Sequence, residues 1–110
     1  MKVDLITLSA LTASDGSIIA SGATIKFGTN FEAGSTNIRI FPKIYRNREL
    51  FESGYTSIQV TKETLPDDIY IQTLTEEDFY TLTPTVIYGI VRDWLNAYYG
   101  EYMIEIDITA

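Results

Sequence analysis

Residues 83–100, TPTVIYGIVRDWLNAYYG, decide the fold because they carry every local signal of an amphipathic helix. Thr83 is a favourable N-cap, and Pro84 follows at the first helical position, where its missing N–H costs nothing. Gly100 supplies a left-handed residue to end the helix. We therefore predict a helix over residues 84–99 that rests on a sheet. Its apolar side chains recur with helical spacing along one face: Ile87, Ile90, Val91, Trp94, Leu95 and Tyr98.

Most of the remaining chain has the alternation and turn residues of short β-strands. Asp15-Gly16 favours positive φ and predicts a hairpin between the first two strands, and Gly22 predicts a bulge or bend within the second. Pro42 cannot donate a ladder hydrogen bond, so we expect its strand to be an edge strand or to carry a bulge. Residues 28–36 are expected to form a loop. The predicted strands cover residues 3–12, 17–27, 37–45, 57–62, 69–74 and 101–109.

Two shorter helical pieces complete the expected architecture. Residues 47–53 are predicted to form one helical turn closed by Gly54, and residues 75–82 a second piece capped by Thr75 with acidic residues in its first turn. Short strands with tight connections favour an antiparallel sheet. We therefore expect a single α+β domain over residues 1–110, with a curved sheet or small barrel, one main C-terminal helix and a final strand. A β-sandwich with the helix at one end is the alternative.

The composition excludes several classes of function. The chain has no histidine and no cysteine, which removes Ser-His and Cys-His nucleophiles, the common zinc sites and any imidazole base. It also lacks a P-loop and a GxGxxG motif. We therefore expect a protein that is not an enzyme and uses no cofactor and no small-molecule substrate. No apolar run reaches the ~20 residues that span a bilayer, and the N-terminus is expected to be a strand and not a signal peptide.

The charge of the chain is unevenly distributed. The formal net charge is −7, which disfavours nucleic acid or an anionic membrane as the main partner. Residues 1–55 hold six basic and five acidic residues, whereas residues 56–110 hold two basic and ten acidic residues. Four of the basic side chains of the first half, at positions 39, 43, 46 and 48, cluster without an acid among them, and aromatic residues alternate with them. The resulting candidate interface consists of Arg39, Phe41, Lys43, Tyr45, Arg46 and Arg48.

The basic cluster has several possible partners. The simplest is pairing with acids of the same molecule, which is the general rule for surface charges. It could also lie opposite an acidic strand such as Glu105 and Asp107, or bind phosphates while its aromatic rings stack on bases. A fourth possibility is association with the acidic half of another copy.

The carboxylates offer weaker candidates for chemistry. Glu105 and Asp107 share a strand face at about 7 Å, within the range of glycosidase carboxyl pairs, so a carbohydrate-directed module is conceivable. Asp67-Asp68 and the acidic residues 76–78 could bind a hard cation through oxygen ligands. Turn, cap and solvation roles explain all of these residues, so we expect no catalytic or metal site.

The outer face of the main helix offers one further interface candidate. Gly89 falls opposite the apolar face, near Arg92, at a position where glycine costs about 1 kcal/mol relative to alanine. Close packing of another backbone against this face would explain the glycine, although drift at a tolerant surface position would explain it equally well. Six of the eight tyrosines lie between Tyr70 and Tyr102, and tyrosine is favoured both at interfaces and at the edge of a core.

The whole chain resembles the small virion structural proteins of tailed bacteriophages, of the neck and tail kind. The resemblance lies in three stretches: LTASDGSIIASGATIKF (residues 11–27), IRIFPKIYRN (38–47) and TEEDFYTLTPTVIYGIVRDWL (75–95). It implies a non-enzymatic subunit of the virion, made in the host cytoplasm, that forms a homo-oligomeric ring and contacts other virion proteins. It implies no specific functional residue. The alternative from a different class is an acidic binding module that blocks a basic, nucleic-acid-binding partner.

Overall fold

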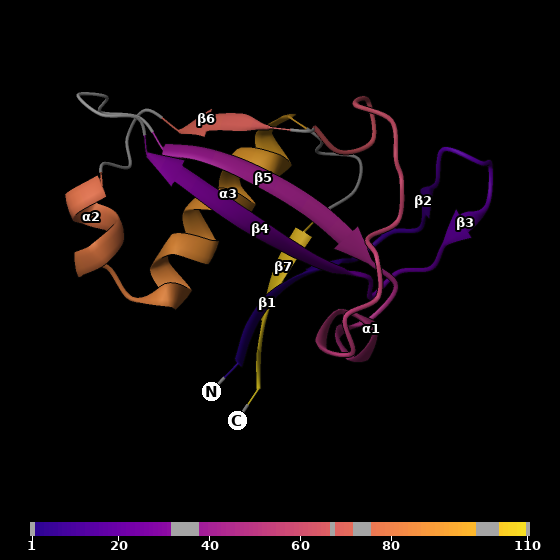
Figure 1. The fold of residues 1–110 in the computed structure, drawn as a ribbon, viewed down its shortest axis with the longest axis horizontal. Helices are drawn as coiled ribbons and strands as arrows, with labels where there is room; N and C mark the ends of the chain where they lie inside the picture. Colours follow the sequence, from indigo (N-terminus) through magenta and orange to yellow (C-terminus); the bar gives the residue numbers. More distant parts are fainter. Residues whose placement is uncertain (1, 32–37, 67, 72–75, 99–103, 110) are drawn as a thin grey trace.

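A computed structural model of the chain describes residues 2–31, 38–66, 68–71, 76–98 and 104–109 (Figure 1). The α+β fold is confirmed. Within the described residues, a five-stranded antiparallel sheet has the strand order β6-β5-β4-β1-β7, and β2 and β3 form a separate hairpin. The strands are β1 (Lys2–Thr7), β2 (Leu11–Thr12), β3 (Ile18–Ile19), β4 (Thr24–Phe31), β5 (Ile38–Tyr45), β6 (Ile69–Ile71) and β7 (Ile104–Thr109). The helices are α1 (Arg48–Glu52), α2 (Glu76–Thr81) and α3 (Pro84–Tyr98).

Helix α3 confirms the prediction for the main helix. The Val86 N–H donates to the Thr83 hydroxyl at 3.4 Å and to the Thr83 carbonyl at 3.1 Å, so Thr83 is the N-cap. Ile87, Val91 and Leu95 are buried, and Ile90 and Trp94 pack against the same core. The predicted stop at Gly100 lies outside the described residues. In Figure 1, α3 lies behind β4 and β5, so it covers one face of the sheet.

The core lies between that face of the sheet and α3. Alternate residues of β5 are buried, as its exposure pattern shows, and the intervening residues face the other side. The β2–β3 hairpin and Leu65 close the ends of the core. Its fully buried members come from β1, β3, β4, β5 and α3: Leu5, Ile19, Ile25, Ile38, Ile40, Ile44, Val91 and Leu95.

The predicted hairpin is confirmed, with shorter strands than expected. Leu11 pairs with Ile19, and Gly16 has a φ of 87° at the turn. The predicted strand 3–12 is interrupted after Thr7. The predicted second strand breaks at Gly22, which also has a φ of 87° and donates its N–H to the Thr7 carbonyl at 2.7 Å. The bend predicted at Gly22 is therefore confirmed.

Two predictions about the middle of the chain are wrong in extent. The loop expected from residue 28 begins later, because β4 continues to Phe31 and pairs with β5. Cross-strand pairing here outweighs the local turn propensity of Gly28 and Asn30. The predicted strand 57–62 is reduced to one bridge between Ile44 and Ile58. The strand predicted over 69–74 is described over 69–71, and helix α2 matches the prediction for residues 75–82 over 76–81.

Pro42 lies in an internal strand, so the expectation of an edge strand or a bulge is wrong. β5 pairs with β4 without a skipped residue, and β6 lies on its other side. The Ile44 carbonyl accepts from the Ile58 N–H at 2.8 Å, so alternate residues of β5, including Pro42, direct their backbone groups away from β4. β6 reaches only Ile40, which leaves Pro42 between β6 and the Ile58 bridge. Its missing N–H therefore removes no ladder hydrogen bond.

Helix α1 confirms the predicted helical turn. The Leu50 N–H donates to the Asn47 side-chain oxygen at 2.9 Å, and Gly54 ends the turn with a φ of 81°. Arg48 of α1 forms an ion pair with Asp4 of β1, and Lys26 of β4 forms a second ion pair with the same carboxylate. The Asp4 side chain is 1 % exposed. This buried carboxylate therefore connects α1, β1 and β4.

Candidate interaction surface

The structure places four of the predicted interface residues in one row on the outer face of β5, opposite α3. They are Arg39, Phe41, Lys43 and Tyr45, which alternate with buried residues of the same strand. In register with them on β4 stand Asn30, Gly28, Lys26 and Thr24. No helix covers the middle of this face in Figure 1, and α1 lies at one end of it. We call the β4–β5 surface on this side the outer sheet face.

Two of the predicted basic residues have carboxylate partners in the same molecule. The Arg39 Nε donates to Asp68 at 2.9 Å, and its guanidinium lies 4.8 Å from the centre of the Phe41 ring. Arg48 is paired with Asp4. Intramolecular pairing, the simplest expectation for the cluster, is thus confirmed for these two residues. The possibility that the cluster lies opposite Glu105 and Asp107 is excluded, because β7 pairs with β1 at the far end of the strand order.

The other two basic residues are exposed. Lys43 has no ion pair within the described part of the chain. Arg46 donates from Nη1 to the Ile18 carbonyl at 3.2 Å. Lys43 stands directly opposite Lys26 in the β4–β5 register, an arrangement of like charges that destabilises a sheet. The positive charge of Lys26 is partly neutralised by its ion pair with Asp4, whereas the Lys43 side chain is exposed to solvent.

A depression of about 560 Å³ lies at the centre of the outer sheet face. The Lys26 ammonium lies 5.2 Å from the centre of the Phe51 ring and 5.7 Å from that of Tyr88, both within cation–π range. Tyr45 and Phe51 pack edge to face at 5.1 Å. Gly28 is exposed, and a Cβ at this position would meet no atom within 4 Å, so the glycine leaves the floor open. We call this depression the aromatic hollow; it is lined by Lys26, Phe27, Gly28, Phe41, Lys43, Tyr45, Phe51 and Tyr88.

A second depression, of about 350 Å³, adjoins the aromatic hollow on the α3 side. Phe27, Gly28 and Tyr88 line both depressions, and the Phe27 and Tyr88 ring centres are 4.7 Å apart. We call this second depression the inner hollow. Its remaining lining residues are mostly apolar: Thr29, Leu82, Pro84 and Ile87. The two hollows therefore meet at the edge of β4, one on each side of the sheet.

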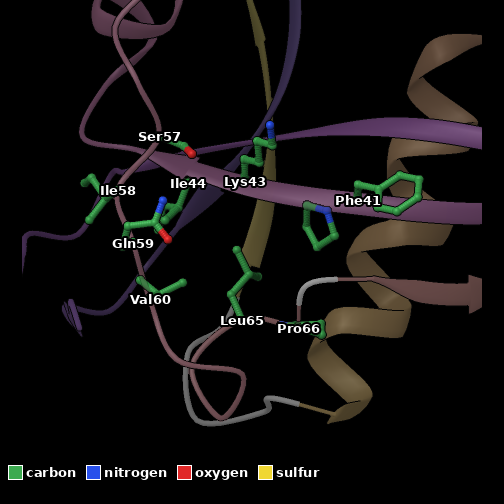
Figure 2. A pocket seen from close by; sticks show the side chains of 10 residues that line it. Phe41, Lys43, Ile44, Ser57, Ile58, Gln59, Val60, Leu65 and Pro66 are labelled. Atoms are coloured by element: carbon green, nitrogen blue, oxygen red, sulfur yellow. The ribbon is translucent and has the colours of Figure 1, made fainter.

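A smaller pocket of about 190 Å³ lies beside Pro42, in the gap between β6 and the Ile58 bridge. In Figure 2, Val60 and Leu65 lie across the pocket from β5, whereas the Lys43 ammonium points away from these two residues. Its polar lining side chains near this gap, Ser57 and Gln59, are uncharged. The pocket therefore brings together no converging ionised groups.

The last two predicted interface residues lie in the other layer. Gly89 and Arg92 belong to α3, where Gly89 is partly exposed. Arg92 donates to the neighbouring Asp93 at 3.1 Å. Among the described side chains of α3, the exposed ones are Pro84, Val86, Asp93 and Ala97. The eight predicted residues thus divide between the two layers of the molecule and do not form one surface.

Sequence reasoning missed five residues of the aromatic hollow: Lys26, Phe27, Gly28, Phe51 and Tyr88. Lys26 and Phe27 lie at the end of the predicted strand 17–27, whereas Gly28 lies in the predicted loop, although all three belong to β4. Phe51 and Tyr88 come from two different helices, and only tertiary packing brings them together. The one available signal was the alternation through Lys26, which extends in register to Gly28 and Asn30.

The carboxylates that were considered for metal or catalysis are not grouped. Among the side chains that the structure describes, no three acidic groups could hold a metal ion together. Asp68 pairs with Arg39, while Asp67 and the side chains of Glu76 and Asp78 lie outside what is described. The clearest electrostatic effect is at Asp15, where hydrogen bonds from the Ser17 hydroxyl at 2.6 Å and the Ser17 N–H at 2.9 Å lower the pKa of the carboxyl.

Within the described residues, no helix is both long and apolar enough to cross a membrane. Comparison of the chain with protein-family models, with curated proteins and with solved structures yields no match.

Proposed function

We propose that this protein is a non-enzymatic assembly subunit that binds copies of itself and other subunits, as a neck or tail component of a bacteriophage virion. Two things support the proposal. The sequence resembles small neck and tail proteins over residues 11–27, 38–47 and 75–95. The structure leaves the outer sheet face uncovered and rich in aromatic side chains, which are enriched at protein interfaces.

The outer sheet face is the observation that carries this proposal. An antiparallel sheet with one solvated face normally presents polar side chains there. Here Phe41 and Tyr45 are only half-buried, Phe51 is 37 % exposed and Tyr70 is 49 % exposed. Lys43 adds a cation without an intramolecular partner in the described chain. Contact with a neighbouring subunit would bury the rings and place a carboxylate beside Lys43.

The described carboxylates lend less support to an acidic module that blocks a basic partner. Such a module needs carboxylates aligned along one surface at roughly phosphate spacing. The exposed carboxylates described here are spread over five separate segments: Asp15 in the hairpin, Glu49 and Glu52 in α1, Glu63 in a loop, Glu77 in α2 and Asp93 in α3. We therefore retain the assembly role as the proposal.

A matched pair of charge reversals tests the role of the outer sheet face. Lys43→Glu and Lys62→Glu each change the net charge of −7 by the same amount, and both lysines are exposed. Lys62 lies in a loop away from the hollow, whereas Lys43 lines it. Sedimentation velocity should show weaker self-association for Lys43→Glu than for Lys62→Glu. Equal behaviour of the two variants would remove the outer sheet face from the interface.

A further inference from the structure

Part of β4 presents an open strand edge to solvent. On one side, β4 pairs with β5 over its whole length, from Thr24 to Phe31. On the other side, its pairing with β1 stops at Ile25. Among the described residues, no strand pairs with this side of β4 beyond Ile25. Gly28, Thr29 and Asn30 are exposed, so the edge is accessible.

Two independent hydrogen bonds show which backbone groups face this edge. The Thr7 N–H of β1 donates to the Ala23 carbonyl at 3.0 Å, so alternate residues from Ala23 onward, including Phe27 and Thr29, face the β1 side. The Ile58 N–H donates to the Ile44 carbonyl at 2.8 Å, which turns the backbone of alternate β5 residues away from β4. Their neighbours on β5 bond to the even-numbered residues of β4. Both observations leave the N–H and C=O of Phe27 and Thr29 directed at the open edge.

The two hollows lie on either face of this same edge. A strand added alongside β4 would direct alternate side chains to opposite faces of the sheet. On the outer side they would meet Lys43 and the rings of the aromatic hollow. On the inner side they would meet Leu82 and Ile87. The site therefore selects an extended segment in which acidic residues alternate with apolar ones.

The chain itself contains one such segment at another sheet edge. β7 has the sequence IEIDIT, in which isoleucines alternate with Glu105 and Asp107. It ends the strand order, and its pairing with β1 leaves its second side without a strand in the described chain. The other edge strand, β6, is described over Ile69–Ile71, and these three residues include no acid. Within one molecule β1 separates β7 from β4, so only the β7 of another copy can reach the β4 edge.

We propose that the open edge of β4 accepts β7 of a second copy, so that the sheets of neighbouring subunits become continuous. This proposal rests on the assembly role proposed above and names its contact. The isoleucine side of β7 would face the inner hollow, and its carboxylates would face Lys43. Because β4 of one copy meets β7 of the next, the two surfaces differ and the association is head to tail. Such contacts close into rings or continue as open chains.

A proline at Thr29 tests the edge directly. Thr29→Pro removes an N–H that faces the edge and leaves the hydrogen bonds to β5 in place, and the preceding Gly28 has no Cβ to clash with the ring. The matched control is Thr56→Pro, the same change at an exposed threonine in a loop. Sedimentation velocity should show self-association reduced at least about tenfold in Thr29→Pro and unchanged in the control. Wild-type association in Thr29→Pro would overturn the β4 site and leave the assembly role standing.

Hydrogen exchange of the unmodified protein keeps the proposal testable if Thr29→Pro does not fold. In dilute protein, the amides of Phe27 and Thr29 should exchange faster than those of Gly28 and Asn30, which bond to β5. At assembling concentrations Phe27 and Thr29 should become protected. Assembly without that protection would overturn the β4 site alone, whereas absence of any assembly would overturn both proposals.

Charge exchange tests whether β7 is the occupant. Lys43→Glu and Glu105→Lys should each weaken self-association severalfold, and the double variant should recover part of the loss because the two charges are exchanged across the contact. A double variant that associates no better than the single variants, while Phe27 and Thr29 still become protected, would identify another occupant. That result would overturn the assignment to β7.

Discussion

At the scale of single residues, Asp4 is a buried carboxylate that forms ion pairs with two cations, Lys26 and Arg48. Its carboxylate is 1 % exposed and lies between Lys26 and Arg48, whose side chains are each 21 % exposed. A buried charge is tolerated only when it is paired. The two cations beside Asp4 therefore offset the cost of burying its charge.

Replacing Asp4 should destabilise the fold strongly. Asp4→Ala leaves Lys26 and Arg48 without their shared partner, and breaking a buried ion pair from one side costs about 3–5 kcal/mol. Asp93→Ala is the control, because the Asp93 side chain is 72 % exposed. Its effect should stay within about 0.5 kcal/mol. Urea unfolding measures both, and similar midpoints for the two variants would show that the Asp4 cluster contributes little.

Asp15 should titrate below its ordinary range. The hydrogen bonds from Ser17 stabilise the carboxylate and lower the pKa of Asp15 in the folded hairpin. Because the folded-state pKa is the lower one, this stabilisation is present above the unfolded pKa of about 3.9 and is lost as the pH falls through the folded pKa. NMR titration should give a midpoint below 3.9 that rises in Ser17→Ala. An unchanged midpoint in Ser17→Ala would exclude the Ser17 hydroxyl as a cause, because alanine keeps the backbone N–H.

At the scale of elements, the sequence predicted those features that depend only on residues close to one another in the chain. The cap at Thr83, the helical spacing of Ile87 to Leu95 and the Asp15-Gly16 turn each have a cause within a few residues, and all three features are confirmed. The extent of β4 was not predictable in this way, because turn-like residues at 28 to 30 are held in a strand by β5. Pro42 is tolerated in an internal strand because β6 pairs with β5 only as far as Ile40. The aromatic hollow combines two strands and two helices, so only the tertiary fold assembles it.

The packing of α3 should account for much of the stability. Leu95 is fully buried against the sheet, so Leu95→Ala should cost about 2–5 kcal/mol. Val86 lies on the same helix and is 46 % exposed, so Val86→Ala should change the free energy of unfolding by less than about 0.5 kcal/mol. Thermal unfolding followed by circular dichroism compares the two. Equal losses would contradict the assigned orientation of the helix.

At the scale of the whole molecule, the sheet face that forms the core is separate from the surfaces that we propose associate with other copies. One face of the sheet packs on α3 and forms the core, and the other carries Lys43, half-buried rings and the open edge of β4. In the proposed assembly, the acidic second half of the chain would supply the complementary charge, with β7 as its extended segment. An arrangement of this kind has different surfaces at its two ends, and such subunits join head to tail.

Light scattering of the unmodified protein over a range of concentrations tests the central claim most directly. We expect the molar mass to rise from 12.4 kDa in dilute solution towards one fixed multiple, because head-to-tail contacts that close into a ring reach a defined size. A mass that remains 12.4 kDa up to the highest concentration would contradict the claim that this subunit works by associating with copies of itself.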